Sequence, residues 1–339
     1  MTIGRPQATI VLGGGPGPGG VGLDEGAVRR LRVDLSVDEL HDRVELWLWP
    51  GSKLAAAKPD DTVEIALGLG GDDSDDVLTA EVAGMSVMPG GVLLSAYCAS
   101  RRLSSAYVGR AWKSTTLGQV VQDLLGDGGV DAGDINASLA FPALHADPRR
   151  CVWSILHDLA RRTGHQITST PDGKVSFGPA PGVSASGGLA GLAAAAGAAA
   201  GAAGSALGTG GSGGELREGA QLIAFAAADW SAAKAIPRVS PSSAQSWFLL
   251  DSAPDDGSTV EIVDPTLRSR EAADAATKAA EAAVSRAKRH ARVRTPGRPS
   301  LRAGGVVRVR DTDYRILSAS HLVDAGQGYV CDLLLEGAA

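Results

Sequence analysis

Alternating apolar and polar residues dominate the first hundred positions of the chain. In the stretch DRVELWLWP, the apolar residues Val44, Leu46 and Leu48 fall on one side, and Trp47 and Trp49 fall on the other. The same period of two continues over residues 31–37, 61–70 and 77–87. This period is typical of strands that bury one face, and polar turns such as AKPDD separate the runs. Residues 1–100 are therefore predicted to form a first small antiparallel β-barrel.

The next segment changes to helical spacing. KSTTLGQVVQDLLGDGG predicts a helix that a serine or threonine at 114 or 115 caps and that Gly126 ends. DPRRCVWSILHDLARRTG predicts a second helix, with Asp147 as its N-cap and Gly164 at its end. HQITSTPDGKVSFGP then predicts a hairpin that turns at an Asp-Gly pair. Residues 101–180 are therefore predicted to form an α+β insert domain of two helices and a hairpin.

The last third of the chain returns to strand-like alternation. AQLIAFAAADW, SSAQSWFLL and the closing run from about residue 304 to 337 predict strands. Between them, an Ala-rich helix is predicted from about 265 to 292, with acids early and bases late, as the helix dipole prefers. Residues 215–339 are therefore predicted to form a second barrel that carries this helix. The fold class is mainly β, with two small antiparallel tube-like β-barrel domains and an α+β insert.

A Gly/Ala-rich segment separates the insert from the second barrel. GGLAGLAAAAGAAAGAAGSALG contains no charge, and its length would allow a membrane span. Insertion is driven by large apolar side chains, however, and the segment contains only three leucines. Residues 181–214 are therefore predicted to be a low-complexity linker rather than a span. Three scattered cysteines and the absence of a signal peptide favour the cytoplasm.

Charge and aromatic residues suggest where partners could bind. The 339-residue chain has a net charge of -6, yet nine Lys/Arg and no acid occur between Arg286 and Arg310. Trp47 and Trp49 are prominent because only 4% of the residues are aromatic. An inter-subunit contact and a place in the wall of the hydrophobic core are equally open interpretations for this pair. The predicted interface residues are Trp47, Trp49, Arg286, Lys288, Arg289, Arg292 and Arg294. Nucleic acid is the alternative partner of segment 286–310, but no interleaved aromatics or known motif supports it.

No pattern in the chain predicts catalysis. The Gly15-x-Gly17-x-x-Gly20 match lacks the helix that a dinucleotide site needs, because alternating strand residues follow it. The six histidines show no metal-ligand spacing, and GDDSDD lacks the spaced pattern of a calcium loop. A Gly-x-Ser-x-Gly match at 210–214 lies in a glycine-rich linker rather than at a strand-to-helix turn. We therefore predict no catalytic residue, no cofactor and no metal, and a protein that is not an enzyme.

Four stretches resemble the hub family of contractile tails, which includes the phage late control gene D protein and the hub half of VgrG. KPDDTVEIALGLGGDDSDDVLTAEVAGMS is similar to the family's strand, Gly-rich turn, strand unit. AYVGRAWKSTTLGQVVQDLLGDGGVD and ADPRRCVWSILHDLARRTGHQITSTPDGKVSFGP resemble its capped helix and its helix–hairpin block. ARVRTPGRPSLRAGGVVRVRDTDYRILSASHLVDAGQGYVCDLLLEG resembles its closing barrel. The resemblance leaves out roughly residues 182–214.

This resemblance implies a structural role. It implies a homotrimer whose two barrels per subunit form a pseudo-sixfold ring, which adapts a sixfold tail tube to a threefold spike. The expected partners are a tail tube protein, baseplate wedge proteins and a separate spike protein, because a VgrG would continue into its spike beyond position 339. Assembly into a tail-like particle in the cytoplasm is expected. The nucleic-acid-binding alternative predicts affinity that falls steeply with salt.

Overall fold

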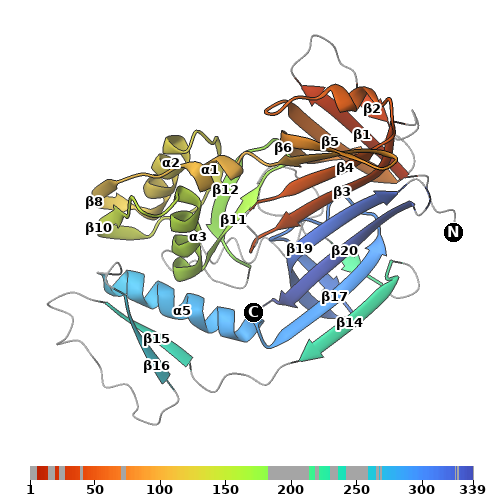
Figure 1. Ribbon diagram of the computed structural model, residues 1–339. Helices are drawn as coiled ribbons and strands as arrows, with labels where there is room; N and C mark the ends of the chain where they lie inside the picture. The colour runs from red at the N-terminus through yellow and green to blue at the C-terminus, as the bar shows by residue number, and fades with distance from the viewer. Residues whose placement is uncertain are drawn as a thin grey trace.

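The computed structural model is mainly β, as the sequence predicts, with helices gathered beside the sheet (Figure 1). The described residues are 6–13, 20–22, 27–38, 41–69, 74–181, 214–217, 221–229, 236–241, 259–264, 267, 269–324, 326 and 328–338. Four sequence predictions fall wholly or mainly outside them: the glycine loop at 15–20, the start of GDDSDD, the Gly/Ala tract and the strand at 242–250.

The first part of the chain forms strands where the period of two predicts them. Its elements are β1 (Pro6–Gly13), β2 (Gly20–Gly22), β3 (Val28–Ser36), β4 (Arg43–Leu48), the 3-10 turn η2 (Lys53–Ala56), β5 (Thr62–Leu69), β6 (Ser74–Met88) and β7 (Gly91–Tyr97). Val44, Leu46 and Leu48 are buried, as the alternation in β4 predicts. They belong to a core that β1 and β5 cover from the other side with residues such as Ile10 and Ile65.

The insert contains the predicted helices and hairpin, with corrected helix ends. Its elements are α1 (Arg101–Ser105), β8 (Arg110–Thr116), α2 (Leu117–Asp127), β9 (Ala132–Ile135), β10 (Ala140–Ala146), α3 (Val152–Thr163), β11 (His165–Ser169) and β12 (Val175–Pro179). Thr116 caps α2, because residues 110–116 pair with β10 as a strand, and the helix continues through Gly126. Asp147 accepts from Arg149 in a separate turn, so α3 begins only after Cys151; Gly164 ends it in the left-handed conformation.

The last part of the chain contains β13 (Glu215–Leu216), β14 (Ala224–Asp229), β15 (Ile236–Pro241), β16 (Thr259–Asp264), α5 (Arg270–Arg286), β17 (Arg289–Pro296), β18 (Val306–Val309), β19 (Thr312–Asp324) and β20 (Gly328–Gly337). The Ala-rich helix is shorter than the predicted 265–292. Ser269 caps its first turn, and residues from His290 onward pair with β20 instead of continuing the helix. Its buried residues Ala272 and Ala276 join the core of the insert.

The first and last parts of the chain share one sheet. Its strand order is β14-β17-β20-β19-β3-β4-β7-β6-β5-β1-β2, and β18 pairs with β19 and β13 beside this path. The two predicted barrels are therefore joined where β3 pairs with β19, from Ser36 opposite Ser318 to Arg30 opposite Asp324. Leu317, Val323 and Tyr329 of the last part also pack into the first core. In Figure 1 this shared sheet runs through the red and blue halves of the molecule.

Candidate functional site

Strand register places a continuous set of polar residues on the sheet face that lies opposite the cores. One row crosses six strands in the order Ala224, Arg294, Asp332, Ser320, Asp34 and Arg43. Their chain neighbours point to the other face, where Val293, Ala319 and Val33 are buried. We call the side that carries this row and its parallel rows the polar face.

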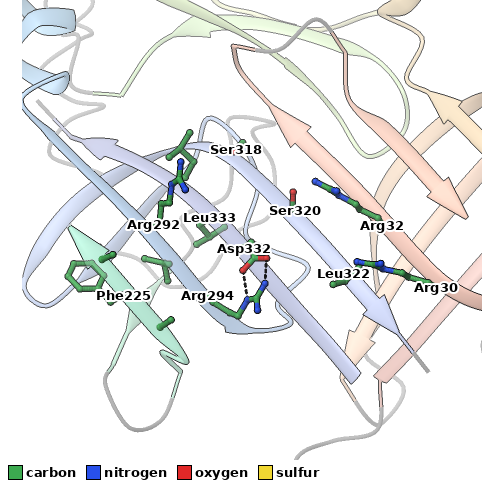
Figure 2. A pocket seen from close by; sticks show the side chains of 14 residues that line it. Arg30, Arg32, Phe225, Arg292, Arg294, Ser318, Ser320, Leu322, Asp332 and Leu333 are labelled. Carbon is green, nitrogen blue, oxygen red and sulfur yellow. Dashed lines mark hydrogen bonds and ion pairs between the residues drawn. The ribbon is translucent and has the colours of Figure 1, made fainter. Parts of the chain in front are cut away.

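A hollow of about 640 Å³ opens on the polar face (Figure 2). Arg30 and Arg32 of β3 lie at one side of it, and Arg292 and Arg294 of β17 lie at the other. Between them the lining includes the small residues Ala224, Ala226, Ser318 and Ser320. Asp332 is the one carboxylate among the described lining residues, so positive charge prevails around the hollow.

Two of these arginines are held by carboxylates, and the other two are not. Arg294 makes two hydrogen bonds of 2.6 Å to Asp332, drawn as dashed lines in Figure 2. Arg32 Nε lies 2.9 Å from Asp34 Oδ1. The guanidinium of Arg30 lies instead over the ring of Trp47, 5.1 Å from its centroid. Arg292 has no ion-pair partner within the part of the chain that the structure describes. The hollow therefore offers two guanidinium groups that no described carboxylate neutralises.

The structure distributes the seven predicted interface residues over four places. Trp47, Arg292 and Arg294 lie on the polar face, which joins segments far apart in the sequence. Trp49 is 42% exposed just beyond β4, with Arg29 over its ring. Lys288 and Arg289 are exposed where α5 turns into β17, and Arg289 pairs with Asp229.

Arg286 differs from the other predicted residues because it is buried, and it pairs with Glu336. Sequence reasoning missed Arg30 and Arg32, although their alternation with buried Leu31 and Val33 was a usable signal.

Among the described strands, the run of eight from β14 to β6 has one open edge along β14 and one along the last residues of β6. Residues of β6 up to Glu81 pair with β5, but from Ala83 to Met88 no described strand lies on the outer side. At this edge Val87 is 90% exposed, and Met85 and Met88 are also exposed. Within the described ranges β14 pairs only with β17, and Ile223 just before it is exposed. Exposed apolar strand edges are templates for pairing with another chain.

The described residues contain no group of three or more His, Cys, Asp or Glu that could hold a metal ion. His321 is buried between Tyr329, whose hydroxyl lies 2.8 Å from its Nδ1, and the carbonyl oxygen of Leu301. Burial lowers the pKa of His321 to about 4, so its ring is neutral and serves packing. Within the same described ranges, no helix is long and apolar enough to cross a membrane.

Known proteins of the same fold are found by structure rather than by sequence. No family model and no curated protein matches the chain. A tail protein of Neisseria meningitidis superposes with a TM-score of 0.65 at 13% identity, covering 98% of this chain and 96% of the other. A 43 kDa tail protein of prophage MuSo2 from Shewanella oneidensis gives 0.62 at 14% identity, covering 97% and 98%.

The third similar structure is an E. coli component of the type VI secretion system, which itself resembles the T4 bacteriophage tail proteins gp27 and gp5. It gives a TM-score of 0.57 at 9% identity and covers 97% of this chain and 77% of the other. The chain therefore has the fold of phage tail proteins over nearly its whole length. At these identities the likeness establishes the fold alone.

Proposed function

We propose that this chain is a structural hub protein of a phage tail or a phage-tail-like contractile injection system. Copies of it close into a ring that joins the tail tube to the spike. The shared fold with two tail proteins and a secretion-system component supports the class of assembly. The number of copies, three, comes from the hub-family resemblance of the sequence. The open sheet edges by themselves are compatible with a closed ring and do not set the number of copies.

The observation that carries the proposal is that an even number of strands lies between the two open edges of the shared sheet. Eight strands lie between the open edges in the order β14-β17-β20-β19-β3-β4-β7-β6. Every neighbouring pair in this run is antiparallel. With an even number of alternating strands, β14 and β6 run in opposite directions. A rotation that brings β6 of one copy beside β14 of the next therefore presents them as an antiparallel pair, which continues the ladder.

The polar face supports the same arrangement. The other face of β3, β4 and β7 is covered by β1 and β5, and that of β19 and β20 by β18. If the sheet closes into a ring, these covering strands occupy the outside, because they would fill a narrow interior. The polar face with its arginine-lined hollow then forms the inner wall. The proposed partners of the ring are a tail tube protein, baseplate wedge proteins and a separate spike protein, and no catalysis is assigned to it.

The nucleic-acid alternative loses its main support. Segment 286–310 was the basis for it, but much of the segment's charge is neutralised within the chain. Four of its arginines pair with carboxylates, namely Arg286, Arg289, Arg294 and Arg308. Arg302 is half-buried and donates to backbone carbonyls. Unpaired charge along a groove is what drives salt-dependent binding to a phosphate backbone.

Native mass measurement tests the ring. The wild-type protein is expected at three times the chain mass of 34.4 kDa, alone or with a spike protein. Val87→Lys and Ile223→Lys each place a charge on one of the two open edges, so both are expected to shift the mass to that of a monomer. Because both side chains are exposed, the circular dichroism spectrum should stay unchanged.

Tyr107→Lys is the matched control. Tyr107 is 62% exposed but lies in the insert, away from both edges, so this variant should keep the oligomeric mass. A wild-type protein that stays monomeric in the presence of tube and spike proteins would overturn the proposal. Edge variants that remain oligomeric would show that the ring, if formed, closes through other surfaces.

A further inference from the structure

A second, smaller pocket lies where the three parts of the chain meet. It has a volume of about 190 Å³ and is lined by residues from the end of β3, from α3, β11 and α5, and from β19 and β20. Its charged and polar lining includes Asp38, Gln166, Arg286, Arg315 and Glu336. We call this site the joint pocket, because each of the three parts contributes to its wall.

In the joint pocket, two buried guanidinium groups form ion pairs with the same carboxylate. Arg286 Nε lies 3.1 Å from Glu336 Oε1, and Arg315 Nη1 lies 2.6 Å from the same oxygen atom. The side chains of both arginines are only 8% exposed, and that of Glu336 is 12% exposed. The buried cluster therefore contains one positive charge more than it has carboxylates. An excess buried charge is costly unless another group compensates it.

The two arginines differ in how well their nitrogens are satisfied. Arg315 donates through Nε and Nη2 to Gln166 Oε1, at 3.1 and 2.9 Å, in addition to its bond to Glu336. Arg286 Nη1 is buried, and no described atom accepts a hydrogen bond from it. Burial lowers the pKa of Arg286, and the positive charge of Arg315 lowers it further. Arg286 is thus a charged donor without a full set of acceptors.

The other described charged groups around the pocket do not supply the missing acceptor. Asp38 is exposed at the rim and attracts Arg286 from a distance, without a hydrogen bond between them. Arg161 is mostly exposed and pairs with Asp158. Burial lowers the pKa of His165, whose Nδ1 lies 2.9 Å from Thr163, and so disfavours the charged form of this ring. His157 also lines the pocket from α3.

We propose that the joint pocket binds a small oxyanion, a phosphate or a carboxylate group, with the guanidinium group of Arg286 as its principal donor. Guanidinium groups form their strongest hydrogen bonds with these two anions. The pocket has room for one such group but not for a nucleotide. A bound anion would contact the barrel strands and the insert at once, so it would fasten the three parts together. This inference is independent of the proposed hub role.

Thermal unfolding of the full-length protein tests the site. Inorganic phosphate, acetate and chloride are compared at equal ionic strength, because general screening acts equally in all three. Phosphate or acetate is expected to raise the unfolding midpoint above the chloride value, in proportion to the logarithm of its concentration at saturating levels. The phosphate and acetate arms separate a free phosphate from the carboxylate of a protein partner. Equal midpoints in all three salts would overturn the proposal.

Two variants and one control locate the effect. Arg286→Met is expected to abolish the anion-dependent shift. Asp38→Asn removes the negative charge at the rim and is expected to tighten anion binding several-fold. This variant tests anion binding in the joint pocket even if Arg286→Met does not fold, because an exposed surface substitution leaves the core intact. Arg292→Met, on the polar face, should keep the wild-type shift. Loss of the shift in Arg292→Met, with retention in Arg286→Met, would assign the anion to the larger hollow instead.

Discussion

Among single residues, Asp34 connects the two halves of the shared sheet. It lies on β3, where its carboxylate accepts hydrogen bonds from Arg32 and Arg43 and from the hydroxyl of Ser320 on β19. Burial by itself would raise the pKa of Asp34. The hydrogen bonds from Ser320, Arg43 and Arg32 outweigh burial and hold the pKa below its usual value. The charged form of this one carboxylate therefore stabilises the seam between β3 and β19.

The lowered pKa of Asp34 predicts a pH dependence of stability. The stabilisation is fully present above the unfolded-state pKa, near about 4, and is lost as pH falls through the lower folded-state pKa. We expect the thermal unfolding midpoint to decrease below about pH 4, and Asp34→Asn to flatten part of that decrease. Asp75→Asn, an exposed aspartate on β6, is the control and should retain the wild-type profile. An Asp34→Asn profile parallel to that of the wild type would contradict this role.

The candidate site shows how far single residues can be read from sequence. Alternation identifies Arg30 and Arg32 as opposite in direction to buried Leu31, but it does not say which strand lies next to β3. Arg294 lies on the same face only because β19 and β20 pair between these two segments. Arg286 looked like part of an exposed basic segment, yet it is buried because α5 ends against β20 at Glu336. Long-range pairing decides both outcomes.

Whole elements were easier to predict than their ends. The period of two identifies β4 because its buried side is strictly apolar, and Gly164 ends α3 because glycine adopts a left-handed conformation, with φ of 73°, at little cost. The start of α3 was predicted too early because Asp147 and Pro148 form a turn that also satisfies local capping rules. The Ala-rich helix was predicted too long because its last residues have helical propensity, but pairing with β20 overrides it.

The hairpin of β6 and β7 depends on one glycine for its close approach to β4. A Cβ atom at Gly91 would lie 2.2 Å from the carbonyl oxygen of Leu48, which is rigid backbone. Gly91→Ala is therefore expected to push the two strands apart and to lower the free energy of unfolding by about 1–3 kcal/mol. Gly84→Ala is the matched control on the same hairpin, because nothing lies within 4 Å of its Cβ position. Urea unfolding curves should show a lower midpoint for the first variant only; equal midpoints would show that the strands adjust without cost.

At the scale of the whole molecule, the sequence predicts two barrels and an insert but not how they are joined. No local pattern shows that β3 and β19, separated by most of the chain, pair from Ser36 to Arg30. The same holds for Gln166 of the insert, which donates to the carbonyl of Gly304 and accepts from Arg315. These contacts depend on strand edges and buried polar groups that match only after each part has folded. They connect the three parts of the chain into one folded unit.

Arg302 contacts all three parts of the chain, so its substitution tests whether these parts unfold as one unit. It lies before β18, is half-buried, and donates to the carbonyl of Val77 on β6 at 2.5 Å and to that of Ser169 on β11 at 3.1 Å. Arg302→Met keeps the hydrocarbon stem but leaves both carbonyls without this donor. We expect the free energy of unfolding to fall by roughly 2–4 kcal/mol, because charged hydrogen bonds to buried groups are lost.

The matched control for Arg302→Met is Arg308→Met, which removes a solvent-exposed ion pair with Asp313 and is expected to cost less than about 1 kcal/mol. Urea unfolding, followed by tryptophan fluorescence and by circular dichroism, measures both variants. If Arg302 couples the parts, its loss should also separate the two probes' transitions, which we expect to coincide in the wild-type protein. Equal, small effects of the two substitutions would mean that the β3–β19 seam alone holds the molecule together.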